Sequence, residues 1–461
     1  MRIVKNSNRR FRFWLHLAGA YISRYKYPFF ITVFTLIISS YFLIRLWPKI
    51  TRADIVTIGY VGNYTIDTIP AEILSLATKS LITVDAKGTP QPLLASHWTV
   101  SDDGKVYTVF LRDDLKWHND EVVDAKDITI AIKNVSITAL NNKTIQFSLP
   151  NPISSFPTAL DKPVFKTKSF YGVGDFRISG IDTSGDTIQK IKLTPKTKGF
   201  PRVEINFYSS QTQLLNAIKI GDVRYASVAN GKVFENFPNL SVSKRASDDE
   251  IVTIFFNTSD QLLGSVDLRE ALSYAINKSS FDGESATGPI APSSWAYNPE
   301  VKRYEYNTGK AKELLSKSQV KNPKIVLSVV GGYEDVAQSV ARDWRDLGVD
   351  VEIKYEKSIP TNYQALIAVD KIPADPDQYA LWHSTQTKTN LTKLNDPKID
   401  KILEDARITQ DEDARKKLYA DFQRFLMEDA PVALLYRPYK YLVTYKNVQP
   451  LVSKLPSLQL E

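Results

Sequence analysis

Blocks of apolar and polar residues along the chain predict an α/β protein built from short strands and amphipathic helices. Residues Lys105–Arg112 alternate, with Tyr107 and Val109 on one face, which predicts a half-buried strand. The preceding block, His97–Val100, alternates in the same way. Ser101–Gly104 joins the two blocks and has a turn-forming composition, because its glycine tolerates positive φ. These residues therefore predict a β-hairpin.

A helix is expected shortly after this hairpin. Asp124 is placed to accept hydrogen bonds as an N-cap residue. Ile128, Ala131, Ile132 and Val135 then recur at helical spacing, so that they share one face. The pattern predicts an amphipathic helix that begins at Asp124.

Two later blocks each have the pattern of a strand, a helix and a second strand. The first covers Val203–Val228 and the second covers Ile325–Tyr355, and their helices are predicted to end at Gly221 and Gly348. A helix that connects two strands in this way usually returns the chain to a parallel neighbour. Two separated units of this kind predict two α/β lobes.

Short motifs spread over residues 55–446 agree with this fold. In the block Pro90–Ile128 the informative residues are Pro92, Leu94, Ala95, Ser96, Trp98, Asp102, Asp103, Gly104, Lys105, Tyr107, Leu111, Arg112, Trp117, Asp120, Ala125 and Asp127. Later in the chain they are Phe256, Asn257, Arg269, Ala271, Leu272, Ala275, Ile276, Tyr306, Ala311, Lys312, Leu314, Leu315, Asp400, Leu403, Ala406, Arg407, Arg415, Tyr419, Gln423, Leu426, Pro431, Leu435 and Tyr436. In identity and order these residues resemble the motifs of the family 5 extracellular solute-binding proteins, the receptors of oligopeptide and dipeptide ABC importers.

That resemblance implies a two-lobed α/β fold of the periplasmic-binding-protein type (type II, family 5) with mixed sheets. Lobe I is expected over residues 54–265, including a small extra subdomain at about 76–165 that is shorter than is usual in the family. Lobe II is expected over residues 266–436. Residues 437–461 are expected to form a return strand and tail that pack on lobe I. One transmembrane helix within residues 1–53 is expected to precede the lobes.

The net charge of +8 comes from the N-terminus rather than from the chain as a whole. The first 53 residues contain ten Lys or Arg and no acidic residue, which leaves 49 basic and 51 acidic residues, a net charge of −2, for Asp54–Glu461. A nearly neutral body lacks the basic excess of proteins that bind a phosphate backbone. We therefore expect no nucleic-acid partner.

Tyr27–Ile44 is a run of eighteen residues without a charge, close to the shortest helix that spans a bilayer. Seven basic residues precede it, so the positive-inside rule places residues 1–26 in the cytoplasm. We expect residues 1–53 to form a cytoplasmic tail and a single-pass anchor in the cell membrane, with its helix at about 27–47. The bulk of the chain is then outside, in the periplasm or at the cell surface. A cleaved signal peptide is the alternative, although no small-x-small site follows the apolar run.

The composition argues against an enzyme and against a metal or cofactor site. The chain has no cysteine, which excludes disulfides, thiolate catalysis, cysteine-bound zinc and a lipid-modified cysteine. It contains no G-x-S-x-G or H-E-x-x-H motif, and its histidines after residue 53 are the scattered His97, His118 and His383. We expect no catalytic residue, no metal ligand and no cofactor.

The segment Ala368–Ser384 is the main candidate for ligand binding, because the family resemblance implies a ligand-facing loop here. In peptide-binding members an aspartate at the position of Ile372 receives the ligand's amino terminus. Asp370 and Asp375 are the nearest acidic replacements, since a buried ammonium group needs a carboxylate partner. The other candidate ligand-binding residues are Asp377, Tyr379, Trp382 and His383 in this segment, Trp295 after a Pro-rich turn, and Asn257 at the end of a strand. An ordinary turn at Asp375–Asp377 and core packing of Trp382 stay open as alternatives.

The resemblance and the missing catalytic motifs together predict a monomeric receptor. We expect it to capture a peptide or peptide-like solute between its lobes and to deliver it to the permease subunits of an ABC transporter. Two alternatives stay open: a non-peptide solute on the same scaffold, and an envelope sensor that is not coupled to transport. An envelope hydrolase would need a nucleophile–base pair, which the sequence does not offer.

Overall fold

The computed structural model describes residues 13–14, 16–17, 19–21, 23–51 and 55–455. The chain divides into two compact units, Met1–Ile55 and Val56–Glu461. Residues 1–12 of the predicted cytoplasmic tail and residues 456–461 of the predicted C-terminal tail lie outside the described part.

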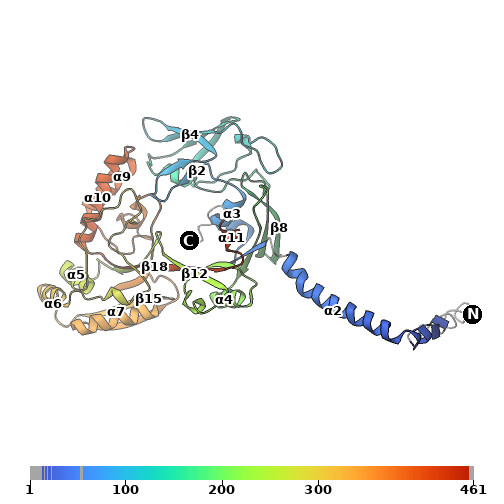
Figure 1. Cartoon of the computed structure of the whole chain (residues 1–461). Coiled ribbons are helices and arrows are strands. Elements are labelled where there is room, and N and C mark those ends of the chain that lie inside the picture. Colours follow the sequence, from blue (N-terminus) through green and yellow to red (C-terminus); the bar gives the residue numbers. More distant parts are fainter. Residues whose placement is uncertain (1–12, 15, 18, 22, 52–54, 456–461) are drawn as a thin grey trace, which may run out of the picture. The chain divides into compact units, whose positions relative to one another are not determined.

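Among its described residues the first unit contains the long helix α2 (Lys26–Thr51), and the helix predicted at about 27–47 lies inside it (Figure 1). Among the described residues, no helix combines the length and the apolar character that crossing a bilayer requires. The transmembrane anchor therefore rests on the sequence pattern alone.

The second unit is organised around a twelve-stranded mixed sheet. Across the sheet the strands follow the order β16 (Asp350–Glu356), β15 (Lys324–Val330), β17 (Ala365–Lys371), β13 (Glu250–Phe256), β18 (Val432–Tyr445), β11 (Tyr225–Val228), β1 (Ile55–Val61), β10 (Arg202–Tyr208), β9 (Thr187–Pro195) and β8 (Phe176–Ser184). Two more strands, β12 (Leu240–Ala246) and β14 (Gly283–Ser285), also pair with β18.

Strand β18 belongs to both halves of this sheet. Its first residues, Val432–Tyr436, pair with β13, and residues 436–438 pair with β14. Its later residues, 439–445, pair with β12 and β11. The strand thus continues through the lobe boundary predicted at residues 436/437, and β13, from the predicted lobe I, pairs with β17 from the predicted lobe II. The lobe boundaries stay a prediction.

Both strand–helix–strand predictions are confirmed. Helix α4 (Gln211–Ile220) connects β10 to β11, which flank β1 in the sheet, and α7 (Glu334–Leu347) connects β15 to its parallel neighbour β16. The two helices end at Gly221 and Gly348, whose φ angles of 84° and 98° are left-handed. Glycine adopts this conformation without a Cβ penalty, which is why the sequence marks both ends clearly.

Helices pack against both faces of the sheet around β13. Val252, Ile254 and Phe256 pack with α5 (Val266–Tyr274) and α7, whereas Ile251 and Phe255 pack with α9 (Pro397–Ile408) and α10 (Glu412–Asp429). A strand that is buried on both faces is expected to be largely apolar rather than alternating, and β13 fits this rule apart from the buried Thr253. The remaining described α-helices are α3 (Ala71–Ala77), α6 (Thr308–Lys317), α8 (Tyr379–Trp382) and α11 (Gln449–Val452).

A smaller four-stranded sheet lies within the predicted extra subdomain. Its strands follow the order β4 (Ala95–Val100), β5 (Val106–Leu111), β7 (Thr144–Ser148) and β6 (Ser136–Asn141). The predicted hairpin is confirmed: β4 and β5 are antiparallel, and the turn between them contains Gly104 at a φ of 66°. Tyr107 and Val109 are buried on the predicted face, together with Leu111. A separate pair, β2 (Ile82–Val84) and β3 (Pro90–Pro92), lies beside this sheet.

The helix predicted after Asp124 is wrong. Asp124 does cap a helical turn, since its carboxylate accepts a hydrogen bond from the Lys126 amide, but that turn is a 3₁₀ helix that ends at Asp127. The residues that follow are not helical, and Ile128 and Ile132 instead pack against the subdomain core as irregular chain. The stretch is rich in β-branched residues, which favour extended backbone over helix.

Candidate functional site

The segment between β17 and α8 forms one wall of a cavity of about 400 Å³. Its lining residues are Val84, Ser155, Thr158, Asp161, Pro373, Ala374, Asp375 and Asp377. The opposite wall comes from β2 and from the 3₁₀ helix η3 (Phe156–Leu160) with the residue before it. The cavity therefore lies between the predicted extra subdomain and the predicted ligand-facing loop, and it contains three carboxylates.

Asp375 is the most buried of these carboxylates, with a relative exposure of 4%. Its Oδ1 atom accepts a hydrogen bond of 2.6 Å from Arg415 Nη2 on α10 and another of 2.9 Å from the Asp377 amide. Its Oδ2 atom is buried and has no hydrogen-bond partner among the described residues. Burial raises the pKa of the Asp375 carboxyl group, and the charge of Arg415 opposes this rise.

The Arg415 side chain is held by two aromatic rings as well as by Asp375. Its guanidinium carbon lies 5.1 Å from the centre of the Trp295 ring and 5.4 Å from that of Tyr419, within the range of cation–π attraction. Arg415 Nη2 also donates to the Tyr419 hydroxyl over 3.2 Å. These contacts fix the arginine against Asp375 Oδ1, whereas the buried Oδ2 has no hydrogen-bond partner among the described residues.

Asp377 joins the two walls of the cavity. Its Oδ2 atom accepts a hydrogen bond of 2.9 Å from the Ser155 hydroxyl and lies 3.3 Å from Arg407 Nε on α9. Its Oδ1 atom accepts a hydrogen bond from the Tyr379 amide at the start of α8. The neighbouring Ser154 amide donates to the Arg407 carbonyl oxygen over 2.8 Å. The walls are therefore connected through side-chain and backbone hydrogen bonds.

Asp161 is the third carboxylate and comes from the opposite wall. Its oxygens accept hydrogen bonds of 2.9 Å from the Ser80 hydroxyl and 3.1 Å from the Val84 amide. Burial raises the pKa of its carboxyl group. Asp161 and Ser155 were missed by sequence reasoning, because nothing in their local sequence distinguishes them from ordinary loop residues.

Trp295 lies next to this cavity without lining it. Its backbone amide donates to the Lys87 carbonyl oxygen in the turn between β2 and β3, and its ring meets Tyr419 edge-on at 5.9 Å. In the same turn Gly88 has a φ of 87°, and a Cβ there would lie 2.3 Å from the Ala374 carbonyl oxygen. Glycine permits this close approach of the turn to the cavity wall.

Asp370 lies on β17 and does not line this cavity. It is 5% exposed, and its Oδ2 atom has no hydrogen-bond partner among the described residues. Burial raises the pKa of its carboxyl group to about 7. Of the two acidic replacements expected for the position of Ile372, only Asp375 faces the cavity.

Tyr379 and Trp382 of α8, and His383 directly after it, contact protein groups rather than the cavity. Trp382 is 1% exposed, packs in the core that α9 and α10 share with the sheet, and donates from Nε1 to Gln378 Oε1 over 2.7 Å. His383 is buried, stacks on the Tyr379 ring at 4.1 Å, and lies with Nε2 3.3 Å from Glu404 Oε1. Their ligand-binding role stays a prediction, and their positions favour packing.

Asn257 follows β13 and serves the local backbone. Its side-chain amide donates to the Tyr363 carbonyl oxygen over 2.9 Å, and its side-chain oxygen accepts from the Ser259 amide. It is not among the residues that line the cavity. Its ligand-binding role likewise stays a prediction.

Comparison with known proteins identifies the family. The model for the bacterial extracellular solute-binding proteins, family 5, middle region, matches residues 89–390, more than half of the chain. The chain belongs to family 5 of the bacterial extracellular solute-binding proteins. These are solute-binding receptors of ABC importers rather than enzymes, as the sequence predicted.

Relatives of this family 5 receptor align over most of their length. The oligopeptide-binding protein OppA of Bacillus subtilis is 24% identical, with 80% of this chain and 84% of the relative covered. The nickel-binding periplasmic protein of Escherichia coli is also 24% identical, with 92% of this chain and 95% of the relative covered. The predicted resemblance is therefore confirmed.

A solved structure supports the fold. The oligopeptide-binding protein AppA from Bacillus subtilis, solved in complex with a nonapeptide, superposes with a TM-score of 0.65 at 21% identity. The match covers 85% of this chain and 94% of that one. The α/β binding-protein fold predicted for this receptor is thus confirmed.

Proposed function

We propose that this family 5 receptor captures a peptide-like solute that carries an ammonium group in the cavity beside Asp375, and hands it to an ABC permease. The observation that carries the proposal is the buried Asp375 Oδ2 atom, which has no partner among the described residues and belongs to a residue that lines the cavity. A buried carboxylate oxygen without a donor costs free energy, and a ligand ammonium group is a donor that removes this cost.

The charges around the cavity favour the same class of solute. Arg415 and Arg407 pair with Asp375 and Asp377, whereas Asp161 makes no ion pair with a described residue. Among the described residues, the lining itself contains three carboxylates and no cationic side chain. A cationic group is therefore attracted, and an anionic one is repelled.

The cavity volume limits the length of the solute. About 400 Å³ lies near the lower end of the range for small-molecule sites. A short peptide, or one end of a longer peptide, fits this size. The contact between Ser155 and Asp377 supports a binding mode in which the two walls close over the solute. Such closure would give the permease a surface that differs from that of the empty receptor.

We further propose that α2 holds the receptor at the membrane. The proposal rests on the uncharged run Tyr27–Ile44 and on the ten basic residues that surround it. Membrane fractionation of cells tests it: the intact chain should sediment with membranes and resist extraction by high salt. Release by salt, or loss of residues 1–53 from the mature protein, would contradict the anchor.

The solute proposal is tested by titrating the purified full-length chain with di- to decapeptides and following its melting temperature. A ligand that binds only the folded state raises the melting temperature as its concentration exceeds the dissociation constant. A flat response to every peptide, from protein that unfolds cooperatively, would contradict the proposal. Mass spectrometry of the molecules that co-purify with the chain would then identify the class of solute.

A further inference from the structure

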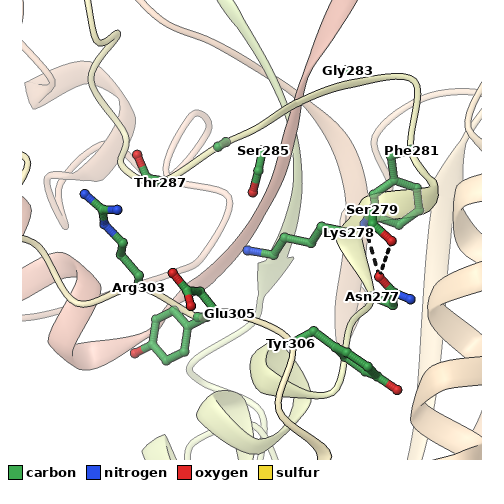
Figure 2. Close-up of a pocket in the computed structure, with 12 residues that line it drawn as sticks. Asn277, Lys278, Ser279, Phe281, Gly283, Ser285, Thr287, Arg303, Glu305 and Tyr306 are labelled. Atoms are coloured by element: carbon green, nitrogen blue, oxygen red, sulfur yellow. Dashed lines mark hydrogen bonds between the residues drawn. The ribbon is translucent and has the colours of Figure 1, made fainter.

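A second cavity, of about 450 Å³, lies beside the apolar core that contains Trp382. Its lining residues are Asn277, Lys278, Ser279, Phe281, Gly283, Ser285, Ala286, Thr287, Arg303, Tyr304, Glu305 and Tyr306. It shares no lining residue with the cavity beside Asp375. Ala286 and Tyr304 belong to the core cluster that also contains Ile372 and Trp382. Figure 2 shows the labelled side chains gathered around an open centre.

Local structure directs Lys278 into this second cavity. Lys278 begins the 3₁₀ helix η5 (Lys278–Ser280), which Asn277 caps by accepting hydrogen bonds from the Ser279 amide and hydroxyl. In Figure 2 the Lys278 side chain extends away from this helix, and its ammonium group ends between Ser285 and Glu305. The backbone geometry at η5 thus presents the cation to the cavity.

Lys278 is half-buried, and its ammonium group makes no hydrogen bond or ion pair with any described residue. Burial lowers its pKa to about 8, and the charge of Glu305 partly opposes this shift. Most of the group is still protonated at pH 7. A half-buried cation without a partner is energetically unfavourable unless an anion joins it.

The other polar groups of the cavity suit a carboxylate. Arg303 is anchored by a hydrogen bond of 3.1 Å from Nη2 to the Pro299 carbonyl oxygen, and in Figure 2 its guanidinium group lies beside Thr287. Glu305 is the one carboxylate among the lining residues, so Lys278 and Arg303 leave an excess of one positive charge. The hydroxyls of Ser285 and Thr287 add hydrogen-bonding groups on the same side.

We propose that this second cavity is a binding site for a small carboxylate of about amino-acid size, held by Lys278 and Arg303 with help from the Ser285 hydroxyl. The volume exceeds the need of a single inorganic ion and suits a small organic molecule. The aromatic rings of Phe281, Tyr304 and Tyr306 provide apolar walls for its carbon skeleton. This site differs in charge from the cavity beside Asp375, which is lined by carboxylates.

The second cavity is also connected to β18, the strand that belongs to both halves of the large sheet. Its edge strand β14 pairs with residues 436–438 of β18, between the parts of β18 that pair with β13 and with β12. Asp282, next to β14, accepts a hydrogen bond from the Tyr441 hydroxyl and pairs with Lys232. A bound carboxylate would thus contact a segment that is tied to both halves of the sheet.

Isothermal titration of the purified full-length chain with succinate tests this proposal, with uncharged succinamide as the matched control ligand. We expect succinate to bind with one-to-one stoichiometry and succinamide not to bind. Lys278→Met should weaken succinate binding at least tenfold, because a desolvated charge pair is lost. Lys310→Met, which removes an exposed lysine on α6 that pairs with Glu313, should leave binding unchanged.

Two results would overturn the proposal: no heat of succinate binding to the unaltered chain, or equal affinity in the Lys278→Met variant. Ser285→Phe provides a second test that keeps Lys278, since the larger side chain fills the cavity and should abolish succinate binding. The melting temperature of each variant shows whether it folds. Peptide-induced melting shifts should persist in both variants, so failure at this site is distinguishable from failure at the cavity beside Asp375.

Discussion

The Ser155 hydroxyl donates a hydrogen bond of 2.9 Å to Asp377 Oδ2, although 222 positions separate the two residues in the chain. The bond joins the residue before η3 to the loop before α8 across the cavity beside Asp375. It is therefore a direct connection between the two walls that would close over a solute.

Replacing Ser155 by alanine should weaken solute binding without unfolding the receptor. One neutral-to-charged hydrogen bond contributes about 1.5–3 kcal/mol, which corresponds to a loss of affinity of roughly ten- to 150-fold. Titration calorimetry with the peptide that gives the largest melting shift measures this change. Ser179→Ala is the matched control, because that hydroxyl bonds the Lys192 carbonyl oxygen on the exposed β8–β9 hairpin. Equal affinities in the two variants would show that the Ser155–Asp377 contact does not take part in binding.

The pair of Asp375 and Arg415 should be far more important for stability than exposed ion pairs are. Arg415→Met leaves the Asp375 carboxylate buried without its cation, and breaking a buried pair in this way costs about 3–5 kcal/mol. Urea unfolding at pH 7 measures the loss. Arg424→Met on the same helix removes an exposed arginine that pairs with Asp421, and it should leave stability nearly unchanged, because water and salt screen exposed ion pairs. Similar losses of stability in Arg415→Met and Arg424→Met would contradict the burial of the Asp375–Arg415 pair.

Asp370 should make stability depend on pH between about 4 and 7. Burial raises the pKa of its carboxyl group from 3.8 to about 7. A raised carboxyl pKa means that the stability present at low pH is lost as pH rises through this range, because the folded state must ionise a buried group. Asp370→Asn should therefore gain stability over the unaltered chain as pH increases from 4 to 8, by an amount on the order of 4 kcal/mol. A difference in stability between Asp370→Asn and the unaltered chain that stays constant from pH 4 to 8 would refute the raised pKa of Asp370.

Trp382 should affect stability rather than solute affinity. It is 1% exposed and donates to Gln378 Oε1, so Trp382→Phe removes both packing and a buried hydrogen bond. We expect a loss of about 1–3 kcal/mol in urea unfolding and an unchanged dissociation constant for peptide. Trp295→Phe, which changes a residue beside the cavity, is the variant with which the peptide affinity of Trp382→Phe should be compared. A large loss of peptide affinity in Trp382→Phe would return this residue to the ligand site.

The fold could be predicted in large part because its signals are local. Gly221 and Gly348 end their helices in the left-handed conformation, and Gly104 turns the β4–β5 hairpin. The failed prediction, the helix after Asp124, shows where local patterns mislead. An amphipathic helix and an irregular segment can both bury the same isoleucines. The sequence pattern therefore does not separate the two structures, and only the tertiary packing distinguishes them.

The candidate site was only partly predictable, because it is assembled from distant segments. Asp375 belongs to the segment that the sequence indicated, but its partner Arg415 lies on α10 and its neighbour Asp161 lies in the predicted extra subdomain. Their spacing in the sequence does not show that Asp375, Arg415 and Asp161 come together around one cavity. It also does not separate Asp375, which lines the cavity, from Asp370, which is buried on β17.

The measurement that tests the central claim most directly compares one short peptide with its N-acetylated form by titration calorimetry on the full-length receptor. If the ligand ammonium group meets the free oxygen of Asp375, the peptide with a free amino terminus should bind at least tenfold more tightly than the acetylated one. Equal affinities for the two forms, or binding of the acetylated form alone, would contradict the account.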